Sequence, residues 1–476
     1  MTDPLPVAAT RSRLALRLLA PADVERVYAA ALDRLARAGV APAGAEAREA
    51  LIAAGATDAG AGALRLPAEL VEAAAARAPK WVVLGARAAA HDVVLEPGAC
   101  LLGAGGRPAP QAQPLAGGRP RPATIADLEE ACRLADALPD VGVVVGPPLQ
   151  TACDGVERFP LADIACAVRA TTKHLLLTGV ASPAIAAVVA DIAGALRDDE
   201  LDLRRRPPLS LVGGAETFAA AAVFARRGLP VGTLVAPLVA TSLADPTPAD
   251  LTQALVAFVA GVLAANAAIQ DLAPGAAFVA PVWPALAGLP ATGPSAATFI
   301  AAATQVLTRA GLPTVSGAFA TSAPAPDWQA CTDGSFAALS SVTSGAALSC
   351  GAGTLCGGAV FSPQQLVADA EIFSWCATIA AGIEVDDETL AVAAIKQVDI
   401  CGNFLGQRHT RRHMKDVWKP RLLDRTPWDA WVAGGRQGAA EKAAELAGAL
   451  LAGHEIEPLN AEPAATLARI IATAGL

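Results

Sequence analysis

Two tryptophan-containing positions have the chemistry to bind a cationic group. Trp283 directly follows an apolar run at 276–282, and Asp327-Trp328-Gln329 comes shortly after another run at 312–317. The face of an indole ring attracts a cation, and a nearby carboxylate adds charge complementarity. A tryptophan at the end of a strand also commonly packs as an apolar plug. Asp327, which follows Pro324-Ala325-Pro326, could equally cap a turn or a helix.

Three further segments supply candidate site residues. Phe319 lies just beyond the run at 312–317 and has the same alternative role as a buried plug, and Glu216 follows the run at 209–213. The segment 103–108 reads Gly-Ala-Gly-Gly-Arg-Pro, which is neither a P-loop nor a clear dinucleotide fingerprint. It is either an ordinary loop or a loop at the mouth of a ligand site, in which case Gly105 and Gly106 are the candidate cofactor-binding residues.

His409 and His413 are spaced i, i+4, which places both on one face of a helix. This is half of a zinc-binding motif, but Thr410 occupies the position of the usual glutamate and no third ligand is evident. We therefore expect no directly bound metal. The basic run around the two histidines is more typical of a solvated face or a docking patch than of a nucleic-acid site.

Several catalytic classes lack their signature in this sequence. There is no G-x-S-x-G nucleophile elbow, and no pair of carboxylates has a spacing that suggests a glycosidase. The nine cysteines are scattered without a C-x-x-C pair, as is typical of reduced, buried cytosolic thiols. The residues alone thus indicate a large cytosolic protein, and an enzyme is the favoured class.

The elements that must position these residues alternate regularly. Short apolar runs are followed by amphipathic or alanine-rich helical stretches, which is typical of parallel βα units. Seven strands are predicted, and an eighth is expected near 356–361; the seven lie at 141–146, 174–180, 209–213, 231–235, 276–282, 312–317 and 346–350. This number of repeats favours a closed (β/α)8 TIM barrel, with an open doubly wound sheet as the alternative.

We predict three regions. Residues 1–122 form a helical region with a small β element at 81–84 and 93–95 and a Gly/Pro-rich loop. Residues 123–384 form the barrel, and residues 385–476 form a helical extension. In such a barrel the active site lies at the C-terminal ends of the strands.

Composition excludes several broad classes. The 476 residues carry a net charge of −9, with 17% charged and 54% apolar residues, which excludes a disordered chain and disfavours general nucleic-acid binding. The mean hydropathy of +0.43 reflects alanine. The longest suspicious run, Ala254 to Ala265, is too short for a hydrocarbon core that needs about 20 helical residues. With no secretion signal at the N-terminus, we expect a cytoplasmic protein that binds no membrane.

The order and spacing of several motifs resemble those of the trimethylamine methyltransferase (MttB-like) family of corrinoid-dependent methyltransferases. The resemblance covers most of the chain. Its N-terminal motifs are Leu66-Pro67-Ala68-Glu69-Leu70, Gly103-Ala104-Gly105-Gly106 and Arg121-Pro122-Ala123-Thr124. Those further along are Gly311-Leu312-Pro313, Pro326-Asp327-Trp328-Gln329, His409-Thr410 and Trp418-Lys419-Pro420-Arg421-Leu422-Leu423-Asp424-Arg425.

The resemblance implies a TIM barrel that moves a methyl group from a methylated amine to the cobalt of a separate corrinoid protein. The sequence contains only standard residues, so it resembles the pyrrolysine-free branch, whose members demethylate quaternary amines such as glycine betaine. A quaternary nitrogen already carries the charge that makes it a leaving group, so the protein mainly needs position and desolvation.

On that basis the expected partners are a small methylated amine and a corrinoid protein, and a homo-oligomer is compatible with the sequence. The ammonium would be held by aromatic or acidic side chains, from Trp283, Phe319, Asp327, Trp328, Gln329 and Glu216. His409 is the candidate for a substrate carboxylate, so Asp327 and His409 are the predicted catalytic residues. Tyr28 is the only tyrosine, which excludes a tyrosine-built ammonium cage.

Two departures from the family pattern keep other functions open. The segments 240–248 and 329–333 differ from the sequences that the family commonly has there. One alternative is a folate-linked methyltransferase on the same barrel, with Asp245, Asn266 and Asp271 binding the pterin. The other is a family member that binds a ligand or partner without turnover.

Overall fold

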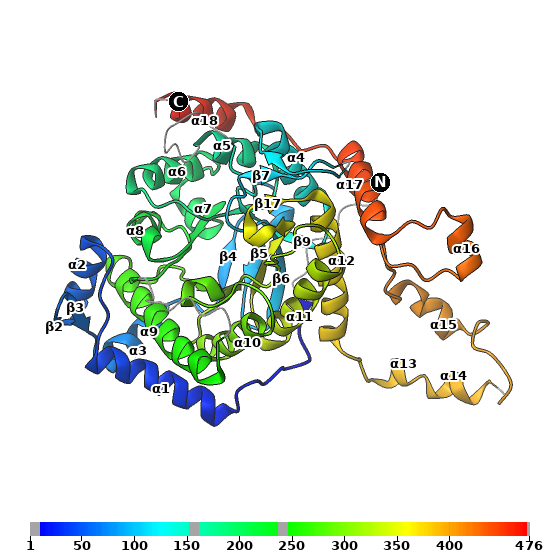
Figure 1. The fold of residues 1–476 in the computed structure, drawn as a ribbon, viewed down its shortest axis with the longest axis horizontal. Helices are drawn as coiled ribbons and strands as arrows, with labels where there is room; N and C mark the ends of the chain where they lie inside the picture. The colour runs from blue at the N-terminus through cyan, green and yellow to red at the C-terminus, as the bar shows by residue number, and fades with distance from the viewer. Residues whose placement is uncertain (1–9, 116, 152–160, 237–245, 399, 474–476) are drawn as a thin grey trace.

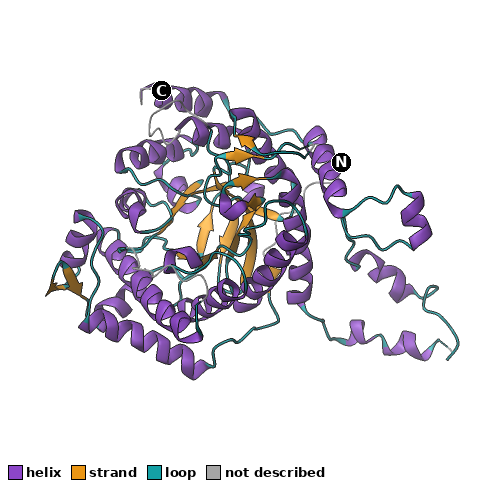
Figure 2. Cartoon of the chain, viewed as in Figure 1, coloured by secondary structure: helices purple, strands orange, loops and turns teal. Residues whose placement is uncertain are grey.

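Eight parallel strands form a closed barrel inside a ring of helices (Figures 1 and 2). The computed structural model describes residues 10–115, 117–151, 161–236, 246–398 and 400–473. The barrel strands are β6 (Ala99–Ala104), β9 (Val141–Gly146), β10 (His174–Leu177), β11 (Leu209–Val212), β12 (Val231–Gly232), β13 (Ala280–Val282), β14 (Thr314–Ser316) and β15 (Leu348–Ala352). Their hydrogen-bonded order is β12-β11-β10-β9-β6-β15-β14-β13, with short β1 (Thr10–Arg11) pairing antiparallel with β6.

The barrel closes between β12 and β13. The Val231 amide donates to the Ala277 carbonyl at 2.9 Å, and the Val279 amide donates to the Val231 carbonyl at 2.8 Å. Gly232 makes this approach possible, because a Cβ there would lie 2.3 Å from the Val279 carbonyl oxygen. The predicted (β/α)8 barrel is therefore confirmed, and the open-sheet alternative is wrong.

The eighth strand is not where the sequence predicted it. The segment near 356–361 holds only η4 (Cys356–Gly358) and β17 (Val360–Phe361), and β17 belongs to a small sheet with β16 (Thr354–Leu355), β7 (Gln111–Ala112) and β8 (Arg121–Pro122). The eighth barrel strand is β6, so the barrel begins before the predicted boundary at 122. The run at β6 is short and wholly buried, but the Gly/Pro-rich excursion that separates it from the next helix hid the βα pattern.

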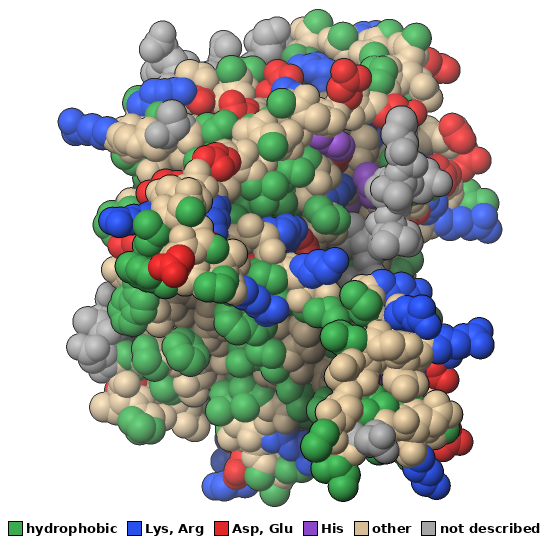
Figure 3. All heavy atoms as spheres, turned by 90° about the vertical axis from the view of Figure 1, so that its right-hand side faces the viewer, with side chains coloured by type: hydrophobic (Ala, Val, Ile, Leu, Met, Phe, Trp, Pro, Cys, Tyr) green, Lys and Arg blue, Asp and Glu red, His purple; other side chains and the backbone are tan. Residues whose placement is uncertain are grey.

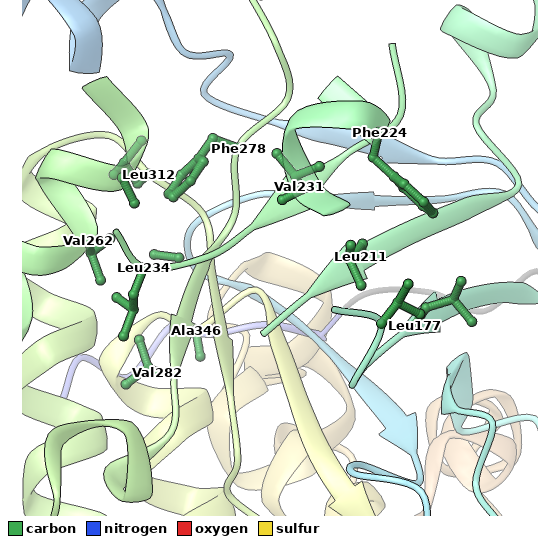
Figure 4. Packing of buried hydrophobic residues seen from close by; sticks show 14 of the residues in the cluster. Leu177, Leu211, Phe224, Val231, Leu234, Val262, Phe278, Val282, Leu312 and Ala346 are labelled. Carbon is green, nitrogen blue, oxygen red and sulfur yellow. The ribbon is translucent and has the colours of Figure 1, made fainter. Parts of the chain in front are cut away.

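The helices outside the barrel follow the predicted alternation. They are α4 (Ile125–Ala137), α5 (Leu161–Ala170), α6 (Pro183–Ala195), α7 (Glu200–Arg205), α8 (Phe218–Arg226), α9 (Pro248–Leu272), α10 (Pro294–Arg309), α11 (Trp328–Ser344) and α12 (Pro363–Ala381). Thr124 begins α4 with a capping box that it shares with Asp127, and Thr247 does the same for α9 with Asp250. Figure 4 shows apolar side chains such as Leu211, Phe224 and Val262 filling the space around the strands.

Helix α9 is longer than the sequence analysis expected. Its 25 residues have a mean hydropathy of 1.8 over the best window, so by length and composition it is one helix that could cross a membrane. However, 72% of that window is buried inside the protein, where α9 packs against α1 (Pro21–Arg37), α2 (Ala45–Ala53), α3 (Ala68–Arg77) and α10. Burial of this kind is typical of a core helix.

One end of the barrel is plugged by the N-terminal region. The strands predicted at 81–84 and 93–95 form an antiparallel hairpin, β4 (Val82–Leu84) and β5 (Val93–Leu95). Val82, Leu84, Val93 and Leu95 share one apolar cluster with inward-facing residues of the barrel strands. Because β5 leads directly into β6, this plug lies at the N-terminal ends of the strands. A second hairpin, β2 (Thr57–Gly60) and β3 (Ala63–Arg65), lies among the N-terminal helices.

The C-terminal part divides into an arm and two packed helices. The arm, residues 383–436, carries α13 (Asp387–Leu390), α14 (Val392–Lys396), α15 (Arg408–His413) and α16 (Trp428–Ala433), and extends away from the barrel at the right of Figure 1. The following α17 (Ala439–Gly453) returns to pack on α12 and α4, and α18 (Ala461–Thr473) packs on α6.

Arg421 anchors the arm to the barrel. Its Nη1 lies 2.6 Å from Asp140 Oδ2, and its Nε lies 3.2 Å from Glu371 Oε2. The buried Glu371 carboxylate also accepts hydrogen bonds from the backbone amides of Arg421 and Leu422. The Trp418–Arg425 motif thus has a structural role, because these bonds hold the returning chain against α12.

Replacing Gly232 with alanine tests its role in closing the barrel. We expect Gly232→Ala to lower the free energy of unfolding by about 1–3 kcal/mol or more, because the added Cβ meets a carbonyl that belongs to the closing strand pair. Gly194→Ala in α6 is the matched control. A Cβ at Gly194 meets nothing within 4 Å, and alanine favours the helix. Urea unfolding measures both variants, and equal stabilities would contradict the proposed role of Gly232.

Candidate active site

Trp283 lies at the C-terminal ends of the barrel strands. It directly follows β13, and its ring reaches the end of β14, where a Cβ on Gly317 would lie 2.7 Å from Trp283 Cδ1. The side chain is partly buried and packs against the apolar cluster that fills the barrel. Trp283 is therefore a wall of the barrel mouth, with part of the indole accessible.

Glu216 follows β11, which is separated from β13 by β12, and it lies in the short helix η2 (Ala215–Thr217). Its side chain is exposed, and Oε1 accepts a hydrogen bond from the Gly214 amide at 3.2 Å. The Gly214 carbonyl in turn accepts from Thr217 Oγ1 and Thr233 Oγ1. The rim at β11 and β12 is thus held by hydroxyl groups, and it presents one carboxylate to solvent.

Gly105 and Gly106 differ in how much free space a side chain would have at each position. Gly105 has φ +86°, and a Cβ there would lie 2.3 Å from the Val145 carbonyl oxygen, so packing requires glycine at this position. A Cβ at Gly106 would meet only Gly351 Cα, at 3.7 Å. The Gly106 carbonyl accepts from Thr178 Oγ1 at 2.8 Å, which ties the loop after β6 to the end of β10. Of the two, Gly106 is the residue open to a ligand.

Asp327 caps α11. Its Oδ1 accepts hydrogen bonds from the backbone amides of Gln329 and Ala330, so the capping interpretation describes its observed contacts. Trp328 is 81% exposed, and Gln329 Nε2 donates to Ser322 Oγ at 3.1 Å. These three residues therefore build the outer surface at the start of a helix. Asp327 as a catalytic residue, and Trp328 and Gln329 as ligand-binding residues, stay predictions.

Two other predicted site residues are not at the mouth surface. Phe319 is 1% exposed and belongs to the main apolar core, packing near Gly334 of α11, so it is the plug that its alternative interpretation described. His409 lies on α15 in the arm, and its Nε2 is 2.8 Å from the Glu388 carbonyl oxygen. Because the arm extends outward, the chain does not bring His409 to Trp283 or Glu216 (Figure 1).

Two buried carboxylates that the sequence analysis missed brace loops at the mouth. Asp163 of α5 accepts from the Thr151 amide and hydroxyl, beyond β9. Asp369 of α12 accepts from the Gly353 amide and from Gln365 Nε2, both at 2.8 Å, beyond β15. The strands β9 and β15 flank β6, so both loops adjoin Gly105-Gly106. The sequence did hold one signal for Asp369, which is its place within the apolar stretch 366–373. A carboxylate in such a stretch is expected to have bonding partners, because carboxylates are rarely buried without them.

Burial raises the pKa values of these two aspartates. Desolvation raises the pKa of Asp369 to about 8, against the opposing effect of its two hydrogen bonds. Desolvation likewise raises the pKa of Asp163. At the other end of the barrel, burial lowers the pKa of His174 to about 4, and this ring bonds to Gly85, Pro207 and Ser210, so it is a neutral structural group.

Two of the three residues named for the folate alternative lie away from the barrel mouth. Asn266 is fully buried within α9, and Asp271 lies at the C-terminal end of that helix. In a βα unit this end of the helix is at the plugged side of the barrel. Asp245, and the altered segment up to that residue, lie outside the described residues. The described part of the chain thus places no two of these three residues at the mouth.

A surface groove of about 500 Å³ is also at the plugged end. Trp81, Val82, Arg204, Pro230 and Gly275 are among its lining residues. They precede or flank the N-terminal ends of the strands, which in barrels serve stability. The groove is therefore separate from the candidate active site.

The raised pKa of Asp369 predicts a pH dependence of stability. The folded chain retains this proton up to about pH 8, whereas an unfolded aspartate releases it near pH 4. Its contribution is fully present below about pH 4 and is lost as the pH rises through about 8. Relative to Asp369→Asn, the wild-type chain should lose roughly 1 kcal/mol per pH unit between about pH 5 and 8.

Urea unfolding of both chains across this range measures the difference. Asp333→Asn is the matched control, because Asp333 bonds to Thr321 in the same region but is not enclosed, and it should retain the wild-type dependence. Parallel pH curves for the wild type and Asp369→Asn would show that Asp369 is ionised in the folded chain.

Comparisons with known proteins agree with the motif resemblance. The family model described as Trimethylamine methyltransferase (MTTB) matches residues 5–474. Trimethylamine methyltransferase MttB of Methanosarcina barkeri (strain Fusaro / DSM 804) is 35% identical over 173 residues, 36% of this chain and 35% of that protein. The MttB of Methanosarcina thermophila is 31% identical over 247 residues, 50% of each chain.

Two further proteins match this chain. One is a relative whose name gives another substrate, and the other is a solved structure. Glycine betaine methyltransferase of Desulfitobacterium hafniense (strain Y51) is 28% identical over 192 residues, 39% of this chain and 40% of that protein. The crystal structure of Methanosarcina barkeri monomethylamine methyltransferase (MtmB) aligns with 91% of this chain and 88% of that chain, at a TM-score of 0.48 and 11% identity. The chain thus aligns with half or less of the length of the curated relatives described here. Since the family model spans nearly every residue, the chain belongs to the trimethylamine methyltransferase (MTTB) family.

Proposed function

We propose that this chain transfers a methyl group from a quaternary amine, of the glycine betaine type, to the cobalt of a separate corrinoid protein. Family membership supports methyl transfer, and the glycine betaine methyltransferase among the relatives supports a quaternary donor. The observation that carries the proposal is Trp283, a partly accessible indole at the C-terminal ends of the strands of a barrel whose other end is plugged. The cytoplasm is the compartment that we propose for this activity.

The mouth offers groups suited to a fixed positive charge. The accessible part of Trp283 provides an aromatic face, and the exposed Glu216 carboxylate lies at another strand end of the same rim. Removing water from around the ammonium strengthens both interactions. The reaction needs no proton transfer, because the donor nitrogen is already cationic and departs as a neutral tertiary amine.

The rim also fits the approach of a large planar cofactor held by another protein. Glycines follow several strands at this end, and at Gly106 a Cβ would fill space that is open in this chain. When bound, a Co(I) corrinoid supplies the nucleophile that accepts the methyl group. The residues of this chain then have two tasks, which are to orient one methyl group outward through the mouth and to exclude water from the ammonium.

A methylation assay tests the reaction. The purified chain is mixed with a Co(I)-loaded corrinoid protein, ideally one encoded beside it, and a panel of quaternary and tertiary methylamines. We expect the absorbance change of cobalt methylation with a betaine-like compound and none with trimethylamine. An unrelated methyltransferase that loads the same corrinoid protein is the positive control. If that control succeeds and every quaternary amine is silent, the proposed reaction is wrong.

Trp283 and Trp81 form a matched pair for testing the site. Loss of a desolvated cation–π contact of about 1–2 kcal/mol should raise the KM of Trp283→Ala by roughly 5–30-fold. Trp283→Phe should lose less, because it keeps an aromatic face. Trp81→Ala should leave the KM unchanged, because that exposed side chain lines the groove at the plugged end of the barrel. Circular dichroism confirms folding of each variant, and an unaltered KM in Trp283→Ala would remove Trp283 from the site.

A further inference from the structure

The arm brings two histidines and a glutamate together outside the barrel. Single ligand atoms of Glu388, His409 and His413 lie within 4.8 Å of one another. The histidines are on α15, with ring centroids 4.5 Å apart, and Glu388 comes from α13, 21 residues before His409. The i, i+4 spacing predicted the histidine pair, but only the folded arm supplies the third group. Figure 3 views the molecule from the side toward which the arm extends in Figure 1.

The hydrogen bonds of His413 leave a lone pair facing the cluster. Its Nδ1 lies 2.9 Å from Asp416 Oδ2, and a carboxylate oxygen can only accept, so Nδ1 carries the proton. Its Nε2 is buried and has no hydrogen-bond partner, yet it lies 3.5 Å from Glu388 Oε1. A lone pair beside a carboxylate oxygen is unfavourable unless a proton or a cation lies between them.

His409 has a complementary arrangement. Its Nε2 donates to the Glu388 backbone carbonyl at 2.8 Å, which leaves the lone pair of the neutral ring on Nδ1. Each histidine thus uses one ring nitrogen as a donor to oxygen and retains the other as an electron-pair donor. Histidines that bind metals are oriented in this way by carboxylates or carbonyls in the outer shell.

The geometry points to a site for a divalent transition-metal cation, Zn(II) by its donor set, held by Glu388, His409 and His413. Two imidazole nitrogens and one carboxylate oxygen leave one tetrahedral position for water. Arg412 pairs with the Glu388 carboxylate, which has lone pairs for both partners. Asp416 Oδ2 lies 2.9 Å from His413 Nδ1, and Asp386 interacts electrostatically with the same ring, so carboxylates adjoin the cluster beside the Arg412 guanidinium.

A cation at this site would link two distant segments of the arm. The chain between α13 and α15 has many exposed apolar side chains, including Leu390, Ile395, Ile400 and Leu405, so little packing holds it in place. A bridge from Glu388 to the histidines closes this loop. We expect the bound cation to order the arm without taking part in chemistry at the barrel mouth.

Zinc titration of the full chain tests the site. After removal of metals with a chelator, calorimetry with Zn(II) should give one equivalent bound per chain. His409→Ala and His413→Ala should abolish that binding, and Glu388→Gln should weaken it at least tenfold. Asp416→Asn should weaken it about 10–100-fold, as outer-shell changes do. Arg411→Ala is the matched control on the same short helix and should bind as the wild type does.

Limited proteolysis between α13 and α15 gives a second readout. Zn(II) should slow cleavage of the wild type and of Arg411→Ala, but not of His413→Ala, and circular dichroism checks that each variant is folded. The proposal is overturned if the chain binds no Zn(II) at about 100 μM. It is equally overturned if Glu388→Gln and Asp416→Asn bind as tightly as the wild type, which would indicate only a surface histidine pair.

Discussion

The short contact between β12 and β13 is the interaction on which the rest of the structure depends. Within the described residues, two backbone hydrogen bonds, both involving Val231, join the last strand pair and turn an eight-stranded sheet into a barrel. Closure gathers the loops that follow all eight strands at one end. Without it, Trp283 after β13 and Glu216 after β11 would lie on distant parts of an open sheet. The absence of a Cβ at Gly232 is therefore a condition for the site as well as for the fold.

The two ends of the barrel are built for different purposes. The β4–β5 hairpin closes the N-terminal end with apolar side chains, and neutral His174 ties that end to Gly85 and Pro207. At the C-terminal end, the Asp163 and Asp369 carboxylates accept hydrogen bonds from the backbone amides of Thr151 and Gly353, in the loops after β9 and β15. These hydrogen bonds hold the chain at Thr151 and Gly353 against the surrounding helices. Positioning and desolvation, the two tasks that the proposed methyl transfer requires, both depend on chain segments held in this way.

The sequence predicted the structural features that neighbouring residues determine. It missed the features that depend on contacts between segments far apart in the chain. Seven strands and their helices were identified because each is an apolar run followed by an amphipathic one. Strand β6 was missed because a long excursion separates it from α4. Asp327 fitted two interpretations equally, because a capping aspartate and a ligand-binding aspartate have the same local sequence. The bond between Asp369 and Gly353, and the approach of Glu388 to the histidines, arise only when remote segments meet.

The distribution of ionisable groups is consistent with a reaction that transfers no proton. An acid–base enzyme places titratable side chains where substrate can reach them and adjusts their pKa values for that purpose. Here the described carboxylates with raised pKa values near the mouth, Asp163 and Asp369, point into the protein and hold backbone amides. Among the described rim residues, the partly accessible indole of Trp283 and the exposed Glu216 carboxylate are groups that attract a cation. A site of this kind would select a substrate by charge and shape, which suits the proposed reaction, in which a partner protein brings the nucleophile that breaks the carbon–nitrogen bond.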